Sequence, residues 1–457
     1  MKKFFYFAMT VLLLTISFAG CNSEEDVVKE RKQVNRPNDE KKSQDEEPNK
    51  DDENKDNGNE NRDPNSGDNS SRTIILTDAQ KVAVSKNNDF AFNFYRQLIQ
   101  QQELNLKEKS NIVSPLSVTY AMGMVNDGAR GKTAEEITKM LGFDDGSAQD
   151  INELCKQLID NAPFVDEQVT LKLADCIITN LGIDLSEQYQ KDMTDYYQAE
   201  TFCKDFSQKS TVDFINDWCD KHTEGMIKKI IDQLDPMAQM VLMNAIYFKA
   251  AWSGKFKKEE TKDEMFTGDN GMRTVPMMHR LDATEYTTNS TYATIGLPYG
   301  TGKNWRMYVL LPNLGKTVGD VLNSLSNKMW SENVAQMYGE YVDVKLPKFK
   351  TESDIDLNEV LKALGAPTMF TSSADFTAMT KQQRELFVGL IKQKAAIEVS
   401  EEGTEASAVT IATYVEDNGG DGGGTPILQF HADHPFVYLI QEASSGAIFF
   451  IGTYHGN

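Results

Sequence analysis

The sequence predicts an α+β fold, and two observations support that prediction. Apolar residues recur with helical spacing early in the ordered part of the chain, where Phe90, Phe94, Leu98 and Ile99 share one face of 88–103. Later segments are strand-like: 307–311, 342–346, 395–399 and 436–440. These helices and strands follow no regular βαβ order, which favours α+β over a parallel α/β fold.

The charge of the chain excludes some classes of partner. Its 457 residues carry a formal net charge of −22. Nucleic-acid binding needs a basic face, so we expect no nucleic-acid partner. The same acidity argues against electrostatic docking on anionic lipid and is best interpreted as a source of solubility.

Residues 1–20 have the pattern of a signal peptide. Two lysines precede the mostly apolar run 4–19, which is short for a membrane-spanning helix of roughly 20 residues. The run ends in Phe18-Ala19-Gly20-Cys21, which resembles a bacterial lipobox, whose Cys is acylated and becomes the new N-terminus. The alternative is an ordinary secretory signal followed by a chance Cys. We expect lipidation, for example by palmitate, at Cys21.

The next segment, residues 21–72, is expected to be a disordered acidic tether. Positions 22–71 hold 16 acidic and 9 basic residues and only three aliphatic ones, all valine. Such a segment cannot bury enough apolar surface to offset the entropy of ordering. Its acidic start resembles an export tag for lipoproteins. We therefore expect a cell-envelope lipoprotein in the outer membrane, with surface exposure favoured, and one domain over 73–457.

The familiar catalytic motifs are missing from the sequence. It contains no G-x-S-x-G and no H-E-x-x-H, and Gly131-Lys132-Thr133 lacks the earlier glycine of a phosphate-binding loop because Asn126 occupies that place. His431 and His434 with Asp433 could suggest a metal pair, but no further ligand set accompanies them. We expect neither an enzyme nor a cofactor or metal site.

Four cysteines follow Cys21, and none of them forms a C-x-x-C pair. A zinc ribbon or redox motif is therefore not indicated. Disulfides are permitted outside the cytoplasm, but their pairing cannot be assigned from the sequence. Buried thiols are the default expectation for Cys155, Cys176, Cys203 and Cys219.

The segment 401–412 combines the properties of a strand and of a loop. Its alternate positions share one face of an extended strand and are all small and uncharged; they are Thr404, Ala406, Ala408, Thr410 and Ala412. Such a segment could enter the middle of a sheet without a clash or a buried charge. The glycine-rich run 415–424 that follows favours a flexible loop. The plain alternative is a strand followed by a glycine linker.

Together with further motifs, this segment resembles the hinge and reactive loop of the serpin family. The resemblance runs in family order from about Phe90 to the C-terminus. Its other motifs are Asn111–Val118, Gly128–Thr133, Asn244–Trp252, Lys345–Phe349, Ala374–Phe376 and Phe430–Ile440.

The resemblance implies a fold and a mechanism. A serpin has three β-sheets, about nine helices and an exposed reactive-centre loop, and its main sheet lacks one strand. A target serine or cysteine protease attacks the loop and forms a covalent acyl complex, and the cut loop then inserts and carries the protease away. We expect a monomer whose hinge comprises Glu401, Gly403, Thr404, Glu405, Ala406 and Ala408.

The resemblance also implies a polar cluster that controls opening of the sheet. Its members would be Ser114, Ser117 and Asn244, with Gln393 where the family usually has His, so that pH-dependent opening is in doubt. Helix capping by the two serines is compatible with that role. Trp252 would pack where the hinge enters, although a plain core Trp is equally consistent with the sequence.

Family spacing from Glu401 places the cleaved bond at Asp417–Asn418. The loop is longer than usual, so Tyr414 and Val415 are alternatives for the residue before the cut. A second function also stays open, namely a non-inhibitory serpin-fold binding protein that proteases cleave as a substrate.

Overall fold

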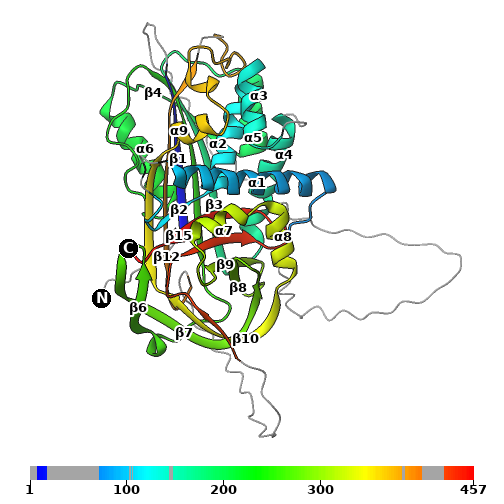
Figure 1. The fold of residues 1–457 in the computed structure, drawn as a ribbon. Coiled ribbons are helices and arrows are strands. Elements are labelled where there is room, and N and C mark those ends of the chain that lie inside the picture. Colours follow the sequence, from blue (N-terminus) through cyan, green and yellow to red (C-terminus); the bar gives the residue numbers. More distant parts are fainter. Residues whose placement is uncertain are drawn as a thin grey trace, which may run out of the picture. The chain divides into compact units, whose positions relative to one another are not determined.

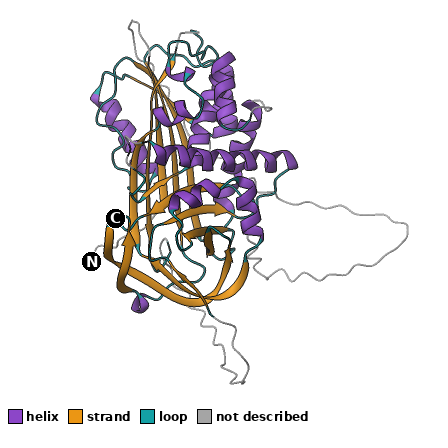
Figure 2. Ribbon diagram, in the orientation of Figure 1, coloured by secondary structure: helices purple, strands orange, loops and turns teal. Residues whose placement is uncertain are grey.

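The computed structural model describes residues 8–17, 72–101, 104, 106–143, 148–382, 386–403 and 427–457. Nine α-helices and fifteen strands occur in these residues (Figure 1). In Figure 2 the helices gather towards one end of the view, and the other end is built mostly of strands. The α+β prediction is confirmed. No helix in these ranges is long and apolar enough to cross a membrane.

The first helix confirms the helical pattern of the sequence but starts earlier than expected. Helix α1 (Asp78–Gln100) begins with a capping box, in which Thr77 Oγ1 accepts from Gln80 N at 3.2 Å and Gln80 Oε1 accepts from Thr77 N at 2.9 Å. Phe94 and Leu98, on its predicted apolar face, are fully buried. The other helices are α2 (Pro115–Gly128), α3 (Gly131–Met140), α4 (Ala148–Asn161), α5 (Glu187–Tyr197), α6 (Lys209–His222), α7 (Val318–Ser324), α8 (Asn327–Ala335) and α9 (Asn358–Ala363).

One sheet of six strands forms the centre of the molecule, and we call it the central sheet. Its order is β11-β12-β1-β5-β3-β4, antiparallel except for the β3–β4 pair. Helix α2 packs against strands of this sheet. The strands are β1 (Ala8–Ser17), β3 (Val169–Asn180), β4 (Glu200–Lys204), β5 (Ala238–Ala250), β11 (Phe349–Asp356) and β12 (Phe387–Val399).

The remaining strands form two sheets that share the long strand β7 (Gly271–Thr288). Residues 271–277 of β7 pair with β6 (Lys262–Gly268), and residues 277–286 pair with β10 (Tyr338–Pro347). Strand β10 also pairs with β13 (Leu428–His431). The last residues of β7 pair with β8 (Tyr292–Tyr299), which starts the second sheet. That sheet continues through β9 (Trp305–Pro312), β14 (Phe436–Glu442), β15 (Ile448–Tyr454) and β2 (Asn111–Val113). Three sheets result, as the resemblance implied.

Strand β1 occupies a place that the sequence did not predict for it. It lies between β5 and β12 and pairs antiparallel with both, so it fills the position that the resemblance left empty (Figure 1). A continuous apolar run suits a strand that has neighbours on both sides in the middle of a sheet. These residues belong to the expected signal peptide, so a processed chain would lack this strand.

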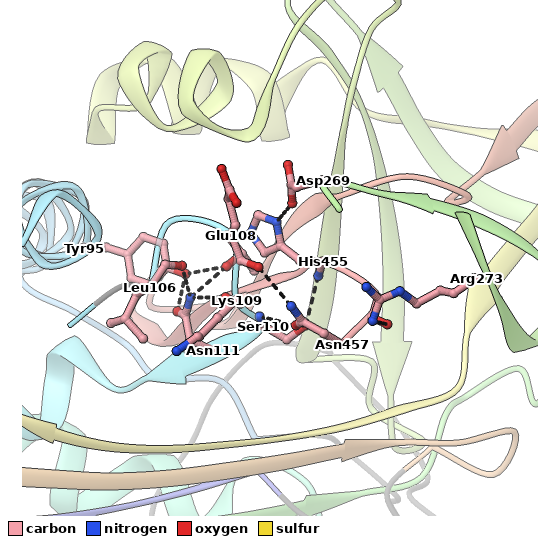
Figure 3. A network of polar contacts seen from close by, with 12 residues as sticks. Tyr95, Leu106, Glu108, Lys109, Ser110, Asn111, Asp269, Arg273, His455 and Asn457 are labelled. Atoms are coloured by element: carbon pink, nitrogen blue, oxygen red, sulfur yellow. Dashed lines mark hydrogen bonds and ion pairs between the residues drawn. The ribbon is translucent and has the colours of Figure 1, made fainter. Parts of the chain in front are cut away.

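The C-terminus is fixed by a polar network around the turn before β2. Asn457 Oδ1 accepts from both Ser110 N and Ser110 Oγ at 2.8 Å, and Asn457 Nδ2 donates to Glu108 O. Arg273 donates to the carbonyl of Gly456 at 2.8 Å. Figure 3 shows these side chains converging from three parts of the sequence. The C-terminal end of the chain is therefore held against the turn before β2.

Candidate functional site: the hinge and the polar row

Helix α2 begins at a serine that also contacts the central sheet. Ser114 is its N-cap, and its Oγ accepts from Ser117 N at 3.1 Å. The backbone of Ser114 binds Gln393 of β12 twice: Ser114 N donates to Gln393 Oε1 at 3.2 Å, and Gln393 Nε2 donates to Ser114 O at 3.0 Å. Capping and contact with the sheet are thus combined in one residue, and the glutamine amide uses both its donor and its acceptor.

A second contact joins the helix to the next strands. Ser117 Oγ donates a short hydrogen bond to Asn244 Oδ1, and Asn244 Nδ2 donates to Asp175 Oδ1 at 2.9 Å. Asn244 lies opposite Asp175 in the β3–β5 ladder. The structure therefore brings Ser114, Ser117, Asn244 and Gln393 to one region, together with Asp175. We call Gln393, Asn244 and Asp175 the polar row.

Asp175 is the member of this row that sequence reasoning missed. Its side chain is buried, and its Oδ2 atom has no hydrogen-bond partner in the part of the chain that the structure describes. Burial raises the pKa of this carboxyl to about 7, although the hydrogen bond from Asn244 lowers it in part. The signal was present in the sequence: a single acidic residue stands in the otherwise apolar run 173–178.

The hinge begins where β12 ends, at a tight turn over Ser400–Gly403. Trp252 holds this turn, since its Nε1 donates to Ser400 O at 2.9 Å and its backbone N donates to Glu402 O at 3.2 Å. Its ring stacks on Tyr299 with centroids 4.3 Å apart. Trp252 therefore contacts the hinge turn directly, and at the same time it is a buried member of the hydrophobic core.

The two acidic residues of the turn are both paired. Glu401 binds Lys348 Nζ at 2.9 Å and accepts from Thr261 Oγ1 at 3.0 Å. Burial alone would raise the pKa of Glu401, but its own backbone N–H and these two partners hold it below the usual value. Glu402 forms ion pairs with Lys258 and Lys255. These contacts fix the turn before the segment that would move.

Gly403 is required by its backbone conformation. Its φ of +89° is one that side-chain-bearing residues rarely adopt, and a Cβ there would lie 2.2 Å from Trp252 N. Gly403 also forms two antiparallel bridges, one to Ser400 just after β12 and one to Ala251 just after β5. At Gly403 itself the backbone therefore runs antiparallel to the ends of β12 and β5.

Strand β13 follows the expected reactive loop in the sequence and is held by an aspartate of β10. Asp343 of β10 binds His431 of β13 through Oδ2 at 2.8 Å and His279 of β7 through Oδ1 at 2.6 Å. These two histidine partners outweigh burial and hold the pKa of Asp343 below its usual value. His434 binds Asp433 and the carbonyl of Pro312 instead. Within the described ranges, no group of three or more His, Cys, Asp or Glu could hold a metal ion.

Several expected site residues lie outside the described residues. They are Cys21, Thr404, Glu405, Ala406, Ala408, Tyr414, Val415, Asp417 and Asn418. The tether from Cys21 to Ser71 also lies outside them.

The four later cysteines are free thiols. Cys155, Cys176 and Cys219 are buried, as expected, whereas Cys203 is exposed, so the expectation was wrong there. Cys203 lies on β4, at the edge of the central sheet, where one side of the strand has no neighbour in the sheet to cover it.

Comparisons with known proteins agree with this geometry. The family model Serpin (serine protease inhibitor) matches residues 85–456. Human Serpin I2 is 29% identical over 389 residues, covering 82% of this chain and 91% of its own. A serpin-like protein of Thermococcus kodakarensis is 32% identical, covering 82% of this chain and 85% of its own.

Solved structures give the same result. The thermophilic serpin tengpin, in its native state, has a TM-score of 0.73 and 26% identity, with 84% of this chain and 96% of tengpin covered. Human thyroxine-binding globulin has a TM-score of 0.72 and 26% identity, with 82% and 98% covered. The hinge turn, the fold and the sequence agree, and the chain belongs to the serpin (serine protease inhibitor) family.

Proposed function

We propose that this chain is a suicide inhibitor of serine or cysteine endopeptidases. The target cleaves the segment after Gly403 and forms an acyl-enzyme, and the cut segment then inserts between β5 and β12. Serpins are generally protease inhibitors rather than enzymes, which supports the general role. The observation that carries the specific mechanism is the alignment of Gly403 with that position in the sheet.

The two bridges of Gly403 define where the following residues would pair. If the antiparallel register continues from Ser400↔Gly403 and Ala251↔Gly403, Ser407 lies opposite Ala396 and Tyr247. Those are the two partners that Met9 of β1 has in the structure. The hinge and the N-terminal segment therefore compete for one position in one register.

The same register gives each hinge side chain its surroundings. Thr404 would lie between Val399 and Ala250, which are both buried. Ala406 and Ala408 would likewise lie between buried pairs, Ile397 with Phe248 and Ala395 with Ile246. Thr410 would lie between Gln393 and Asn244 of the polar row. Small uncharged residues on this face are what insertion requires.

The bond that the target attacks is proposed to be Asp417–Asn418, with Tyr414 and Val415 as alternatives. Asp at this place suits a protease that prefers acidic residues. Attack after Tyr414 or Val415 suits chymotrypsin-like or elastase-like enzymes.

We further propose that the inhibitor is a lipoprotein of the cell envelope, acylated at Cys21, in the outer membrane and facing outwards. The lipobox-like sequence and the acidic segment after it support this location. An anchored inhibitor of this kind would protect the cell surface from host or neighbouring proteases.

The decisive experiment incubates the chain from Arg72 to Asn457 with serine and cysteine proteases that prefer Asp, Tyr or Val. Inhibition by trapping gives a band of inhibitor plus protease that survives denaturation, and the new N-terminus of the released peptide locates the bond. Clean cleavage with full protease activity across the panel would overturn the inhibitory function and leave the fold unchanged.

One observation favours a second function, a binding protein. Thyroxine-binding globulin is among the similar structures and was solved with its hormone. This chain has a pocket of about 440 Å³ beside α1 and α8, with the ion-paired Arg306 and Glu285 in its wall. Thyroxine is therefore a reasonable first probe if no covalent complex forms.

A further inference from the structure

Asp175 lies in the interior without a charge to balance it. It is 2% exposed, and none of the ion pairs between described residues includes it. Among the residues that the structure describes, its side chain has one hydrogen bond, from Asn244 Nδ2 to Oδ1, and no partner for Oδ2. An ionised carboxylate in such a place is costly, whereas a neutral carboxyl group is tolerated.

The titratable groups that face Asp175 do not supply a positive charge either. They are Tyr120 of α2, Cys155 of α4, Tyr197 of α5 and Cys176 of β3. Burial raises the pKa of each of these groups, and a negative Asp175 raises it further. All four therefore stay neutral near pH 7.

The position of Asp175 connects its charge to the opening of the sheet. The side chain of Asp175 binds Asn244 of β5, the strand next to β1. Asn244 in turn binds Ser117 of helix α2. When β5 moves relative to α2, water can reach this row and solvate a carboxylate. The intact sheet, in contrast, favours the neutral acid.

We propose that Asp175 is a pH-sensitive control point of the central sheet, neutral while the sheet is intact and ionised when the strands separate and admit water. Rising pH then favours opening. The link to loop insertion rests on the proposed function, whereas the protonation state of Asp175 does not.

The direction of the pH dependence follows from the protonation of Asp175 in the folded and the unfolded chain. The pKa of Asp175 is raised from 3.8 to about 7 in the folded chain, so folding favours the protonated form. The contribution of Asp175 to the stability of the native state is therefore fully present at low pH and is lost as pH rises through this window, with no further loss well above pH 7. Between about pH 5 and pH 8 the unfolding constant should rise on the order of 100-fold more than in an Asp175→Asn variant.

The test uses the full-length chain for spectra and urea unfolding, and the chain from Arg72 to Asn457, which lacks β1, for protease trapping. Each is compared with its Asp175→Asn variant, whose amide copies the neutral acid. Infrared spectra should show the carbonyl stretch of a protonated buried carboxyl group that titrates near pH 7 in the wild type and is missing in the variant. Urea unfolding from about pH 5 to pH 8 should show the steeper pH dependence in the wild type only.

Asp127 provides the matched control. It is another largely buried carboxyl, and burial raises its pKa to about 6, against the hydrogen bond from Asn152. It lies in α2 at the end away from the sheet, next to the turn that leads to α3. Asp127→Asn should remove its own band and leave the Asp175 band in place. It should also leave any pH dependence of protease trapping unchanged.

Each outcome decides the proposal. An unchanged carbonyl band and unchanged pH dependence in Asp175→Asn overturn it. If the carbonyl band is lost in Asp175→Asn but the pH dependence of trapping is unchanged, Asp175 is protonated in the native state and has no role in opening of the sheet. Absence of trapping at every pH counts against the proposed function alone, because the infrared arm still reports on Asp175. If the variant does not fold, ¹³C-carboxyl-labelled aspartate in the wild type tests for an acid that titrates near pH 7.

Discussion

At Gly403 a single residue determines how the loop leaves the sheet. The left-handed backbone and the close approach to Trp252 leave no room for a side chain, and the two bridges align Gly403 with the position between β5 and β12. The first residue beyond it, Thr404, would meet two buried neighbours, Val399 and Ala250. Residue 404 is therefore where a change should affect insertion most directly.

Replacing Thr404 with Arg should convert an inhibitor into a substrate. The guanidinium would have to be buried between Val399 and Ala250 without a partner, which costs several kcal/mol and slows insertion. Deacylation then overtakes trapping, and we expect the fraction of protease recovered as covalent complex to fall by about tenfold or more. Quantitative denaturing gels of complex against cleaved inhibitor measure this ratio.

The matched control is Glu405→Arg, which places the same charge one residue further along. In the same register residue 405 lies between Glu398 and Lys249, which are only half-buried, on the opposite face of the strand. This variant should trap nearly as well as the wild type. Equal trapping by Thr404→Arg, or equal loss in both variants, would contradict the register.

The polar row shows what a sequence can and cannot say about single residues. Ser114, Ser117, Asn244 and Gln393 could be found because each lies within or near a motif of recognisable order. Asp175 lies in no such motif, and only the ladder between β3 and β5 reveals that it faces Asn244. The amide of Gln393 does not titrate. The titratable group of the polar row is instead the carboxyl of Asp175 on β3, which is the second strand from β1 in the central sheet.

At the scale of elements, local patterns were sufficient for most helices and strands but not for β1. The strand-like segments at 307–311, 342–346, 395–399 and 436–440 all lie inside strands, because period and β-branched content are local properties. The run 4–19 is apolar throughout, and such a run fits a signal peptide and a central strand equally well. The place of β1 between β5 and β12 could not be predicted from the run itself, because a position in a sheet depends on the neighbouring strands as well.

Strand β1 leads to a prediction about processing. A Cys21→Ser change should prevent lipid attachment and leave residues 1–20 on the chain, which intact mass and palmitate labelling detect. With the segment Ala8–Ser17 retained, the place of the hinge is filled, so covalent trapping should fall strongly although the hinge is intact. A chain that begins at Asn22 should trap normally.

A second variant separates blocking from the loss of lipid. Leu12 of β1 lies opposite both Asn244 and Gln393, and proline is not tolerated in the middle of a sheet. Adding Leu12→Pro to the Cys21→Ser chain should restore trapping without restoring lipid. Equal trapping by Cys21→Ser and by the chain from Asn22 would show that β1 does not block the hinge, and a palmitate-labelled Cys21→Ser chain would overturn the lipidation site.

At the scale of the whole molecule, the two ends of the loop are held very differently. The N-terminal side leaves the sheet after Gly403 and could extend the central sheet, whereas the C-terminal side continues into β13, β14 and β15. Those strands are fixed by the buried sheet, by Asp343 with His431, and by the network around Asn457 (Figure 3). One cut should therefore release only one side.

Cleavage in the loop should thus stabilise the molecule rather than weaken it. Insertion of about ten residues would add a strand paired on both sides, as β1 is, so we expect the unfolding temperature of a chain from Arg72 to Asn457 to rise by about 10 °C or more on cleavage, which corresponds to roughly 8 kcal/mol for a domain of this size. Calorimetry before and after limited proteolysis measures the shift, and gel filtration without denaturant should show both fragments eluting together.

Cleaved Thr404→Arg provides the comparison. Its backbone is cut, but its segment cannot easily enter the sheet, so its unfolding temperature should rise much less on cleavage. If wild-type and variant chains gain nothing on cleavage, the loop does not insert and the molecule is cut as an ordinary substrate; if both gain equally, insertion does not pass residue 404 in the register that Gly403 defines.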